Sequence, residues 1–298
     1  MAAATTGILW TDADRAALAE IIRLALAEDI GTGDLTTNLL VPAGATGAAN
    51  VVVRQPGVIA GLPAAAQAYA AVDPAVRFEL AVPDGTQVSP GQTVATVRGS
   101  ARSLLTGERL ALNLLGRMSG IASLTRQYVD AVAGTRAGIF DTRKTTPGWR
   151  LLEKYAVRAG GGKNHRIGLF DAVLIKDNHL AFGAANGAGR YTPQEAVARA
   201  RAAAPAGTVI EVEVDTLQQL ELVLPAGPDI VLLDNMPPDV LRQAVARRDA
   251  GFPRIELEAS GGVNLRSVAA IAATGVERIS SGALTHSAIA LDIGLDWI

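Results

Sequence analysis

Apolar residues near the start of the chain recur at the spacing of an amphipathic helix. The stripe consists of Leu18, Ile21, Ile22 and Leu26. Thr11 precedes it as a candidate N-cap, and Asp12 and Asp14 suit the positive end of a helix. The pattern therefore predicts a first helix that ends before the glycine-containing segment EDIGTGDLTT at 28–37.

From Ala48 to Gly99 the pattern changes to short β-branched stretches separated by Pro-Gly and Asp-Gly turns, which is typical of small strands. The run DGTQVSPGQTVATVRG is similar to the half-barrel repeat of biotinyl and lipoyl carrier domains. Such carriers need a lysine at a hairpin tip for their cofactor. No lysine precedes Lys144, so a carrier function is excluded and only the shape is similar.

Beyond Ser103 a long helical stretch leads into short strands that alternate with helices. We expect strands at 138–142, 172–176, 209–214, 230–234, 255–259 and 277–281. We expect helices between them at 193–204, 217–224, 239–248 and 265–273. Such strand–helix units predict a closed (β/α) barrel. An open dinucleotide-binding sheet is less favoured, because its G-x-G-x-x-G motif is absent. The final LDIGLDWI is strand-like and is predicted to pair back onto the first domain.

Composition narrows the class of protein further. The 298 residues contain no cysteine, which excludes disulfides, cysteine nucleophiles and thiolate metal sites. The formal charge of −2 argues against nucleic acid as a partner. No apolar run approaches the roughly 18 residues of a membrane span, and the start lacks a basic segment followed by an apolar one. We therefore expect a cytoplasmic protein with no membrane partner.

The basic residues are unevenly distributed. Only four of the 27 are lysines, and all four lie between Lys144 and Lys176. The stretch 141–176 contains eight basic and three acidic residues, so its net charge of +5 is balanced by −7 elsewhere. The only four lysines are therefore concentrated in the most basic part of the chain.

A helix is predicted inside this basic stretch. Thr146 is its candidate N-cap, Pro147 fits the first turn, and the glycines from Gly160 onward end it. The four-residue spacing of three basic residues favours a stripe that faces solvent. The stripe consists of Arg150, Lys154 and Arg158.

In an α/β barrel the chemistry lies where strands end, on one face. The polar residues at these junctions are Asp141–Thr146, Lys176–His179, Glu213 with Asp215, Asp234–Asn235, Ser260–Gly262, Ser280–Gly282 and, further on, His286. Charge inside an apolar strand is costly unless it is paired. The two-residue period nevertheless places two glutamates on one face of each of two strands, Glu211 with Glu213 and Glu256 with Glu258. Junctions of this kind indicate a catalytic face.

Two kinds of residue at the junctions point to a multiply anionic ligand. The SGG and SSG sequences at 260–262 and 280–282 offer backbone N–H groups to a phosphate. Basic side chains can converge on the same ligand, and arginine forks fit planar carboxylates. These side chains are Arg143, Lys144, His165, Arg166 and Lys176.

Taken in order, the motifs resemble those of one family. They are EDIGTGDLTT, GERLALNLLGRMSGIAS, DTRKTTPGWRLLEKYAVRAGGGKNHR, LFDAVLIKDNHL, VEVDTLQQLE, LLDNMPP and LEASGGV. They resemble those of quinolinate phosphoribosyltransferase, also called carboxylating nicotinate-nucleotide pyrophosphorylase, over nearly the whole chain. The chain departs from the family after Leu180, where AFGAANGAGRYTP is longer and richer in glycine than usual.

The resemblance implies a fold and a reaction. The expected fold class is α/β, with an N-terminal α/β sandwich domain at 1–116, rejoined by 288–298, and an incomplete (β/α) barrel domain at 117–287. The implied reaction moves a phosphoribosyl group from phosphoribosyl pyrophosphate to quinolinate, with decarboxylation. It yields nicotinate mononucleotide, pyrophosphate and CO2 for NAD biosynthesis. The family also implies a homodimer with sites at the subunit interface.

The resemblance also implies roles for residues at matching positions. Quinolinate would be held by Arg109, lent across the dimer, with Arg143, His165, Arg166 and Lys176. Lys144 would lie between quinolinate and the donor, so the catalytic set is Lys144, Glu213 and Asp234. Glu213 and Asp234 would face the ribose and Mg²⁺. The donor phosphate would bind at Ser260, Gly261, Gly262, Ser281 and Gly282.

Two other enzyme activities remain as alternatives. A related phosphoribosyltransferase could use nicotinate without decarboxylation, although two arginines with a histidine and a lysine favour a dicarboxylate. A Schiff-base aldolase is the more distant alternative, because Lys144 and Lys176 both follow barrel strands.

Overall fold

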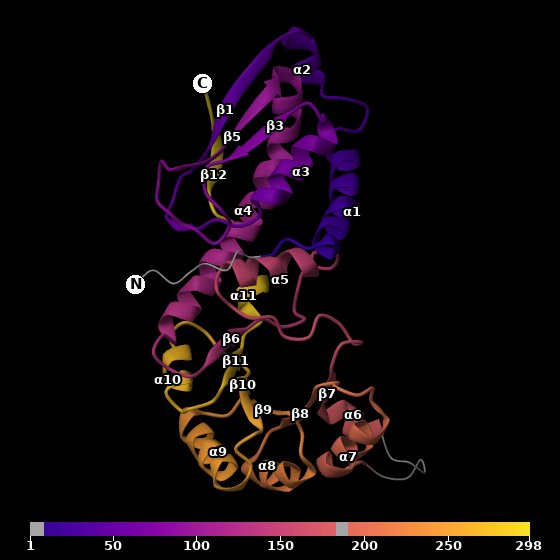
Figure 1. The fold of residues 1–298 in the computed structure, drawn as a ribbon, viewed down its shortest axis with the longest axis vertical. Helices are drawn as coiled ribbons and strands as arrows, with labels where there is room; N and C mark the ends of the chain where they lie inside the picture. The colour runs from indigo at the N-terminus through magenta and orange to yellow at the C-terminus, as the bar shows by residue number, and fades with distance from the viewer. Residues whose placement is uncertain (1–8, 183–189) are drawn as a thin grey trace. The chain divides into compact units, whose positions relative to one another are not determined.

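The computed structural model describes residues 9–182 and 190–298 and divides the chain into two compact units (Figure 1). The first unit contains the N-terminal part up to Arg126 together with Lys144–Gly162 and Leu284–Ile298. The second contains Gln127–Arg143 and Lys163–Ala283. The expected boundary at 116/117 lies inside one long helix, and 144–162 groups with the first unit rather than with the barrel.

An antiparallel sheet forms one layer of the first unit, in the order β12-β1-β5-β3. Its strands are β1 (Thr46–Val53), β3 (Arg77–Leu80), β5 (Thr93–Ser100) and β12 (Ile293–Trp297). A separate pair consists of β2 (Gly57–Val58) and β4 (Gln87–Val88). The pairing of β12 with β1 confirms that the C-terminal segment returns to the first domain.

Helices form the other layer of this unit (Figure 1). They are α1 (Asp12–Asp29), α2 (Leu35–Leu40), α3 (Leu62–Val72), α5 (Arg150–Ala159) and the part of α4 (Ala101–Ala131) that lies before Gln127. Thr11 caps α1 in a reciprocal capping box with Asp14, as the sequence predicted. In α4, a Cβ on Gly120 would lie 2.0 Å from the Ile289 carbonyl oxygen, so glycine is required where the C-terminal segment crosses the helix.

Six parallel strands form the sheet of the second unit, in the order β6-β11-β10-β9-β8-β7. They are β6 (Gly138–Phe140), β7 (Val173–Ile175), β8 (Ile210–Val214), β9 (Ile230–Asp234), β10 (Glu256–Ser260) and β11 (Arg278–Ser280). All six predicted strands are confirmed. Within the described residues β6 and β7 are the two sheet edges and do not pair with each other. The prediction of a closed barrel is therefore wrong, and the implied incomplete barrel is confirmed.

Helices follow the strands of the second unit (Figure 1). They are α6 (Asp177–Phe182), α7 (Pro193–Ala203), α8 (Leu217–Val223), the 3-10 turn η1 (Leu224–Ala226), α9 (Pro238–Gly251) and α10 (Val268–Ala272). α11 (Ala283–His286) begins at the end of this unit. The glycine-rich segment after Leu180 falls largely on residues 183–189, which lie outside the described residues.

Two predictions for the basic helix α5 are wrong. The helix begins at Arg150 with Trp149 as N-cap, because Gly148 has a positive φ of 82° that interrupts the helical path. Thr146 instead donates its hydroxyl to Glu153. The basic stripe does not face solvent throughout, since Lys154 is 1% exposed.

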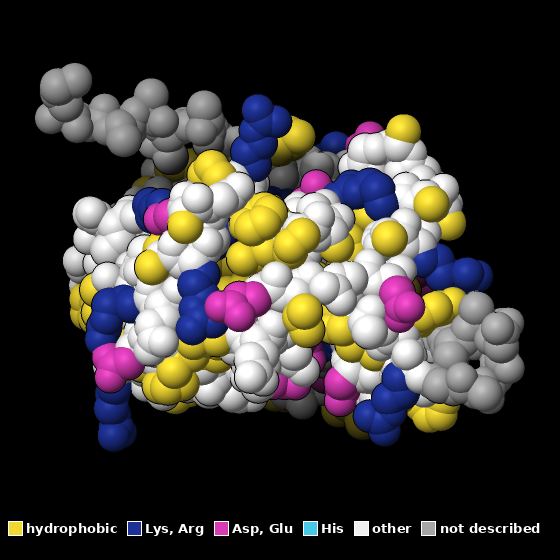
Figure 2. Space-filling view, turned by 90° about the horizontal axis from the view of Figure 1, so that it is seen from below, with side chains coloured by type: hydrophobic (Ala, Val, Ile, Leu, Met, Phe, Trp, Pro, Cys, Tyr) yellow, Lys and Arg dark blue, Asp and Glu magenta, His cyan; other side chains and the backbone are white. Residues whose placement is uncertain are grey.

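Basic and acidic side chains alternate on the face of the molecule seen in Figure 2, which looks from the side of α8 and α9. Among the helices and loops of the second unit, arginines pair with acidic residues, as in Arg201 with Asp229 and Arg247 with Glu221. In the described part of the chain, no helix combines the length and apolar character needed to cross a membrane.

Candidate active site

The carboxyl ends of the parallel strands bring most of the predicted site residues to one edge of the second unit. Asp234 and Ser260 are register partners at the ends of β9 and β10. Glu213 lies near the end of β8, and Lys176 directly follows β7. Arg143 lies three residues beyond β6, and Ser281 directly follows β11. This edge is the place where α/β barrels carry their chemistry.

Two predicted arginines of the second unit, Arg143 and Arg166, act on each other electrostatically. Burial lowers the pKa of Arg166, and the positive charge of Arg143 lowers it further. The Arg166 Nη1 donates to the Ala172 carbonyl oxygen at 3.2 Å. Two arginines whose positive charges act on each other favour a ligand with more than one negative charge.

His165 lies in the interior of the second unit between two buried glutamates. Its Nε2 is 2.9 Å from the Glu211 Oε2 and 3.4 Å from the Glu258 Oε1. Its Nδ1 accepts the backbone N–H of Arg166 at 2.8 Å. The Asp141 carboxylate accepts the backbone N–H of His165 at 2.8 Å. Strands β6, β8 and β10 thus all help to hold this loop residue.

The two glutamates differ in their surroundings. Burial lowers the pKa of His165, but the hydrogen bonds to Glu211 and Glu258 outweigh it and raise the value to about 9. Burial raises the pKa of Glu211. Burial acts in the same direction on Glu258, but contacts with His165 and Arg278 outweigh it and lower the pKa. Arg278 Nε donates to Glu258 at 2.6 Å, and its guanidinium lies 3.7 Å from the centroid of the Phe140 ring.

Acidic residues at the neighbouring strand ends are also engaged. The Lys176 ammonium forms an ion pair with the Glu213 carboxylate. The Asn235 side-chain amide donates to the Asp234 carboxylate at 2.7 Å. The pair Glu213 and Asp234 therefore lies on adjacent strands, each carboxylate already oriented by a neighbour.

The predicted phosphate loop after β10 is tied to the same asparagine. Asn235 donates its backbone N–H to the Ser260 carbonyl oxygen at 2.9 Å. A Cβ on Gly261 would lie 2.2 Å from the Asn235 Oδ1, whereas a Cβ on Gly262 would meet nothing within 4 Å. In the second predicted loop, Ser281 donates its hydroxyl to the Val263 carbonyl oxygen. Gly282 follows at the start of the next turn.

Two predicted residues belong to the first unit. Arg109 is exposed on α4 and lines a groove of about 320 Å³ together with Asp34, Leu35 and Leu105. The Lys144 carbonyl oxygen accepts the Thr285 hydroxyl at 2.7 Å.

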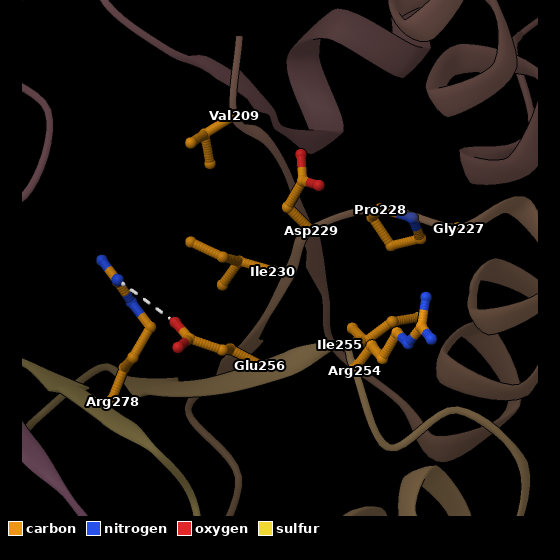
Figure 3. Close-up of a pocket in the computed structure, with 9 residues that line it drawn as sticks. All are labelled: Val209, Gly227, Pro228, Asp229, Ile230, Arg254, Ile255, Glu256 and Arg278. Atoms are coloured by element: carbon orange, nitrogen blue, oxygen red, sulfur yellow. Dashed lines mark hydrogen bonds and ion pairs between the residues drawn. The ribbon is translucent and has the colours of Figure 1, made fainter. Parts of the chain in front are cut away.

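A larger pocket of about 510 Å³ opens at the amino ends of β8, β9 and β10 (Figure 3). Asp229 and Arg254 line it, and Arg278 reaches it from β11 and contacts Glu256 at 3.4 Å. This pocket lies at the opposite end of the parallel strands from the predicted site residues, so it is separate from the catalytic face.

The sequence identified the charged strand positions but missed some of the residues that organise them. Glu211 and Glu258 were recognised as strand charges that need partners when buried, but no role was assigned to them. Asn235 was recognised only as a polar residue at a strand end, and Arg278 was not singled out. No sequence pattern marks Arg278, whereas the position of Asn235 directly after the buried run of β9 did place it among the polar junction residues.

A fold of this kind, with paired arginines, acidic strand ends and Ser-Gly loops on one edge, defines an α/β-barrel enzyme for anionic small molecules. Family models for the N-terminal and C-terminal domains of quinolinate phosphoribosyl transferase match residues 34–119 and 121–296. The chain therefore belongs to this family.

Individual relatives agree over the full length. The chain is 48% identical to a carboxylating nicotinate-nucleotide pyrophosphorylase of Mycobacterium leprae, over 97% of this chain and 100% of that protein. It is 43% identical to a probable enzyme of the same name from Bacillus subtilis, over 94% and 93%. The solved nicotinate-nucleotide pyrophosphorylase of Francisella tularensis is 35% identical and superposes with a TM-score of 0.88, over 99% and 100%.

Proposed function

We propose that the protein transfers a phosphoribosyl group from phosphoribosyl pyrophosphate to quinolinate and decarboxylates the product to nicotinate mononucleotide. The observation that carries this substrate choice is that two arginines of the second unit, Arg143 and Arg166, act on each other electrostatically, since the charge of Arg143 lowers the pKa of Arg166. Such a pair suits two adjacent carboxylates better than one. The full-length similarity to carboxylating nicotinate-nucleotide pyrophosphorylases supports the same reaction.

The reaction needs no nucleophile from the protein. The quinolinate nitrogen forms a bond to C1 of the ribose as the bond from C1 to pyrophosphate breaks, and pyrophosphate keeps the electron pair. The ring then carries a positive charge that draws electrons from the adjacent carboxylate. The bond to that carboxylate breaks, CO2 leaves, and a proton replaces it on the ring carbon. The work of the protein is therefore to bind, orient and exclude water.

The carboxylates of quinolinate are assigned to Arg143, His165, Arg166 and Lys176, with Lys144 toward the donor. Glu213 and Asp234 face the ribose, where negative charge stabilises the positive charge that develops at C1. Lys176 forms an ion pair with Glu213, which suits a residue that binds an anionic ligand better than the nucleophilic lysine of a Schiff-base aldolase.

Magnesium is the metal that fits this donor set. Glu213 and Asp234 supply carboxylate oxygens on adjacent strands, and Mg²⁺ is commonly held by one or two carboxylates plus substrate phosphates. Bound there, it would neutralise the charge of the departing pyrophosphate. The donor phosphate is assigned to the two loops formed by Ser260, Gly261 and Gly262 and by Ser281 and Gly282.

The active assembly is proposed to be a homodimer in which Arg109 reaches the barrel of the partner. In the first unit, Leu35, Leu39 and Leu40 of α2 are 76–80% exposed. Leu35 lines the same groove as Arg109. An apolar helix surface beside an exposed arginine suits an interface between two copies. We place the enzyme in the cytoplasm.

A product assay tests the function directly. The purified protein is mixed with quinolinate and phosphoribosyl pyrophosphate, with and without Mg²⁺, and nicotinate mononucleotide, pyrophosphate and CO2 are measured. We expect equal amounts of the three products, only with Mg²⁺. Nicotinate in place of quinolinate is the matched control, and faster turnover of nicotinate without CO2 would contradict the proposed substrate.

A further inference from the structure

Four charged side chains form a buried cluster in the interior of the second unit, which we call the buried quartet: His165, Glu211, Glu258 and Arg278. Glu211 and Glu258 are 2% and 0% exposed. Glu258 stands between the two cations, since one oxygen accepts Arg278 Nε at 2.6 Å and the other lies 3.4 Å from His165 Nε2. Two negative and two positive groups make the quartet electrically neutral when the histidine is protonated.

The two nitrogens of the His165 ring have different partners. With its proton on Nε2, the neutral ring donates to Glu211, and Nδ1 accepts the Arg166 backbone N–H. A second proton on Nδ1 would turn that nitrogen from an acceptor into a donor and open its contact with the Arg166 N–H. The new N–H would then be available to a carboxylate beside Arg166.

We propose that Glu211 and Glu258 are positioning residues that hold the His165 ring and supply its counter-charge, so that Nδ1 donates to a carboxylate of quinolinate. The role of Arg278 is to keep Glu258 ionised. This proposal rests on the proposed function for the identity of the carboxylate ligand. The raised pKa of His165, about 9, agrees with a ring that is protonated at neutral pH.

Other charged groups near the His165 ring do not replace Glu211 and Glu258 as its counter-charge. The Asp141 carboxylate is occupied by the His165 backbone N–H and by the Asn164 side chain, at 2.8 and 2.6 Å. The charges that act on the ring are those of the two glutamates, which contact Nε2 directly.

A metal ion is the competing occupant of the quartet. His165, Glu211 and Glu258 place ligand atoms within 4.8 Å of one another, and Glu211 Oε1 is buried without a hydrogen-bond partner. Arg278 argues against a cation here, since it already neutralises Glu258 at 2.6 Å. If the His165 ring is neutral, a bound divalent ion would give the buried quartet a net positive charge, which is costly in a buried place.

The first test uses Glu211→Gln, which removes one charge and leaves the Arg278–Glu258 pair intact. The protein has three histidines, so ¹⁵N-histidine NMR can follow each ring, and His165→Gln identifies the His165 signal. We expect Glu211→Gln to lower the pKa of His165 from about 9 toward the ordinary 6.5. Glu258→Gln is the second variant and should act in the same direction with a larger loss of stability.

Calorimetric titration supplies the functional readout. Loss of a charge-assisted contact should raise the Kd for quinolinate about tenfold in either folded variant and leave the Kd for phosphoribosyl pyrophosphate within about twofold. If the two glutamates had only a structural role, the variants would bind both ligands more weakly. Glu256→Gln is the matched control, because Glu256 is on the same strand and touches Arg278 but is half exposed and does not contact His165. We expect it to change neither Kd.

The outcomes separate this proposal from the proposed function. An unaltered chain that binds no quinolinate contradicts the function. An unaltered chain that binds quinolinate, with Glu211→Gln binding it equally well and keeping the His165 pKa, overturns the role of the glutamates. One equivalent of transition metal per unaltered chain after dialysis against chelator, lost in Glu211→Gln, also overturns it.

Discussion

At the level of single residues, the residue that follows β9 has an unusual backbone conformation. Asn235 has a φ of 53°, and among the described residues it is the only non-glycine residue in the left-handed region. Such a conformation costs about 1–3 kcal/mol and persists where the surroundings impose it. Here the same residue orients the Asp234 carboxylate and fixes the backbone after Ser260. The two hydrogen bonds of Asn235 therefore link the proposed metal carboxylate to the proposed phosphate loop.

Glycine substitutions in that loop should separate crowding from backbone strain. Gly261→Ala introduces a Cβ 2.2 Å from the Asn235 Oδ1 and 2.9 Å from its backbone nitrogen, at a φ of 92°. We expect it to push Asn235 away from Asp234 and to raise the Kd for phosphoribosyl pyrophosphate more than tenfold. Calorimetric titration of that ligand measures the change.

The neighbouring glycine provides the control for this prediction. A Cβ on Gly262 meets nothing within 4 Å, although its φ is 61°. Gly262→Ala should therefore leave the contact between Asn235 and Asp234 in place, and its cost to folding should be the strain of a left-handed alanine, about 1–2 kcal/mol, as measured by denaturant unfolding. Equal effects of the two substitutions on donor binding would show that contact with Asn235 does not matter.

Some of the site residues could be predicted from the sequence and others could not. The two-residue period placed Glu211 with Glu213 and Glu256 with Glu258 on strand faces. Glu256 is half exposed, whereas Glu211 and Glu258 are indeed buried. Their common partner could not be predicted, because His165 reaches them from a loop whose path depends on tertiary packing. The roles given to Arg109 and Lys144 come from the family resemblance and stay predictions.

At the level of elements, the parallel strands were predictable and the start of α5 was not. Short apolar runs bounded by polar junctions mark strands buried on both faces, and all six were found. For α5, Thr146 and Pro147 are good helix-start residues, but the positive φ of Gly148 separates them from the helix. Glu153, which is fully buried, then binds Thr146 through its side chain.

Glu153 is also the basis of a stability prediction for the first unit. Arg117 on α4 pairs with it at 2.7 Å and donates to the carbonyl oxygens of Thr285 and Ala288. Arg117→Ala would leave the Glu153 carboxylate without its cation and the C-terminal segment without two hydrogen bonds. We expect a loss of about 3–5 kcal/mol in the free energy of unfolding, measured with urea.

A surface arginine is the comparison for this buried pair. Arg23 pairs with Glu20 on α1, and both side chains are more than half exposed. Arg23→Ala should change the free energy of unfolding by less than about 1 kcal/mol. If Arg117→Ala costs no more than Arg23→Ala, the carboxylate of Glu153 is not dependent on Arg117.

At the level of the whole molecule, the number of strand–helix units did not determine whether the barrel closes. Six units suggested closure, yet β6 and β7 remain edges within the described residues. Closure requires pairing between the first and last strands, and such long-range pairing leaves no local pattern in the sequence. In this protein, Lys163 bridges to Phe140 at the β6 edge, and the loop that follows carries His165 into the interior. The open side thus gives a loop residue access to the strand glutamates.

The proposed dimer makes a quantitative prediction for mixed subunits. If Arg109 acts in the partner's site, an Arg109→Ala subunit has an intact barrel and a Lys144→Ala subunit has an intact arginine to lend. Each variant alone should be nearly inactive. A hybrid of the two has one fully native site and one site with both defects. Random exchange makes about half of the dimers hybrids, so an equal mixture should recover about a quarter of native activity.

Activity is measured by nicotinate mononucleotide formation, after native mass spectrometry has verified exchange. Hybrids that form but stay inactive would mean that Arg109 serves its own subunit or no site at all.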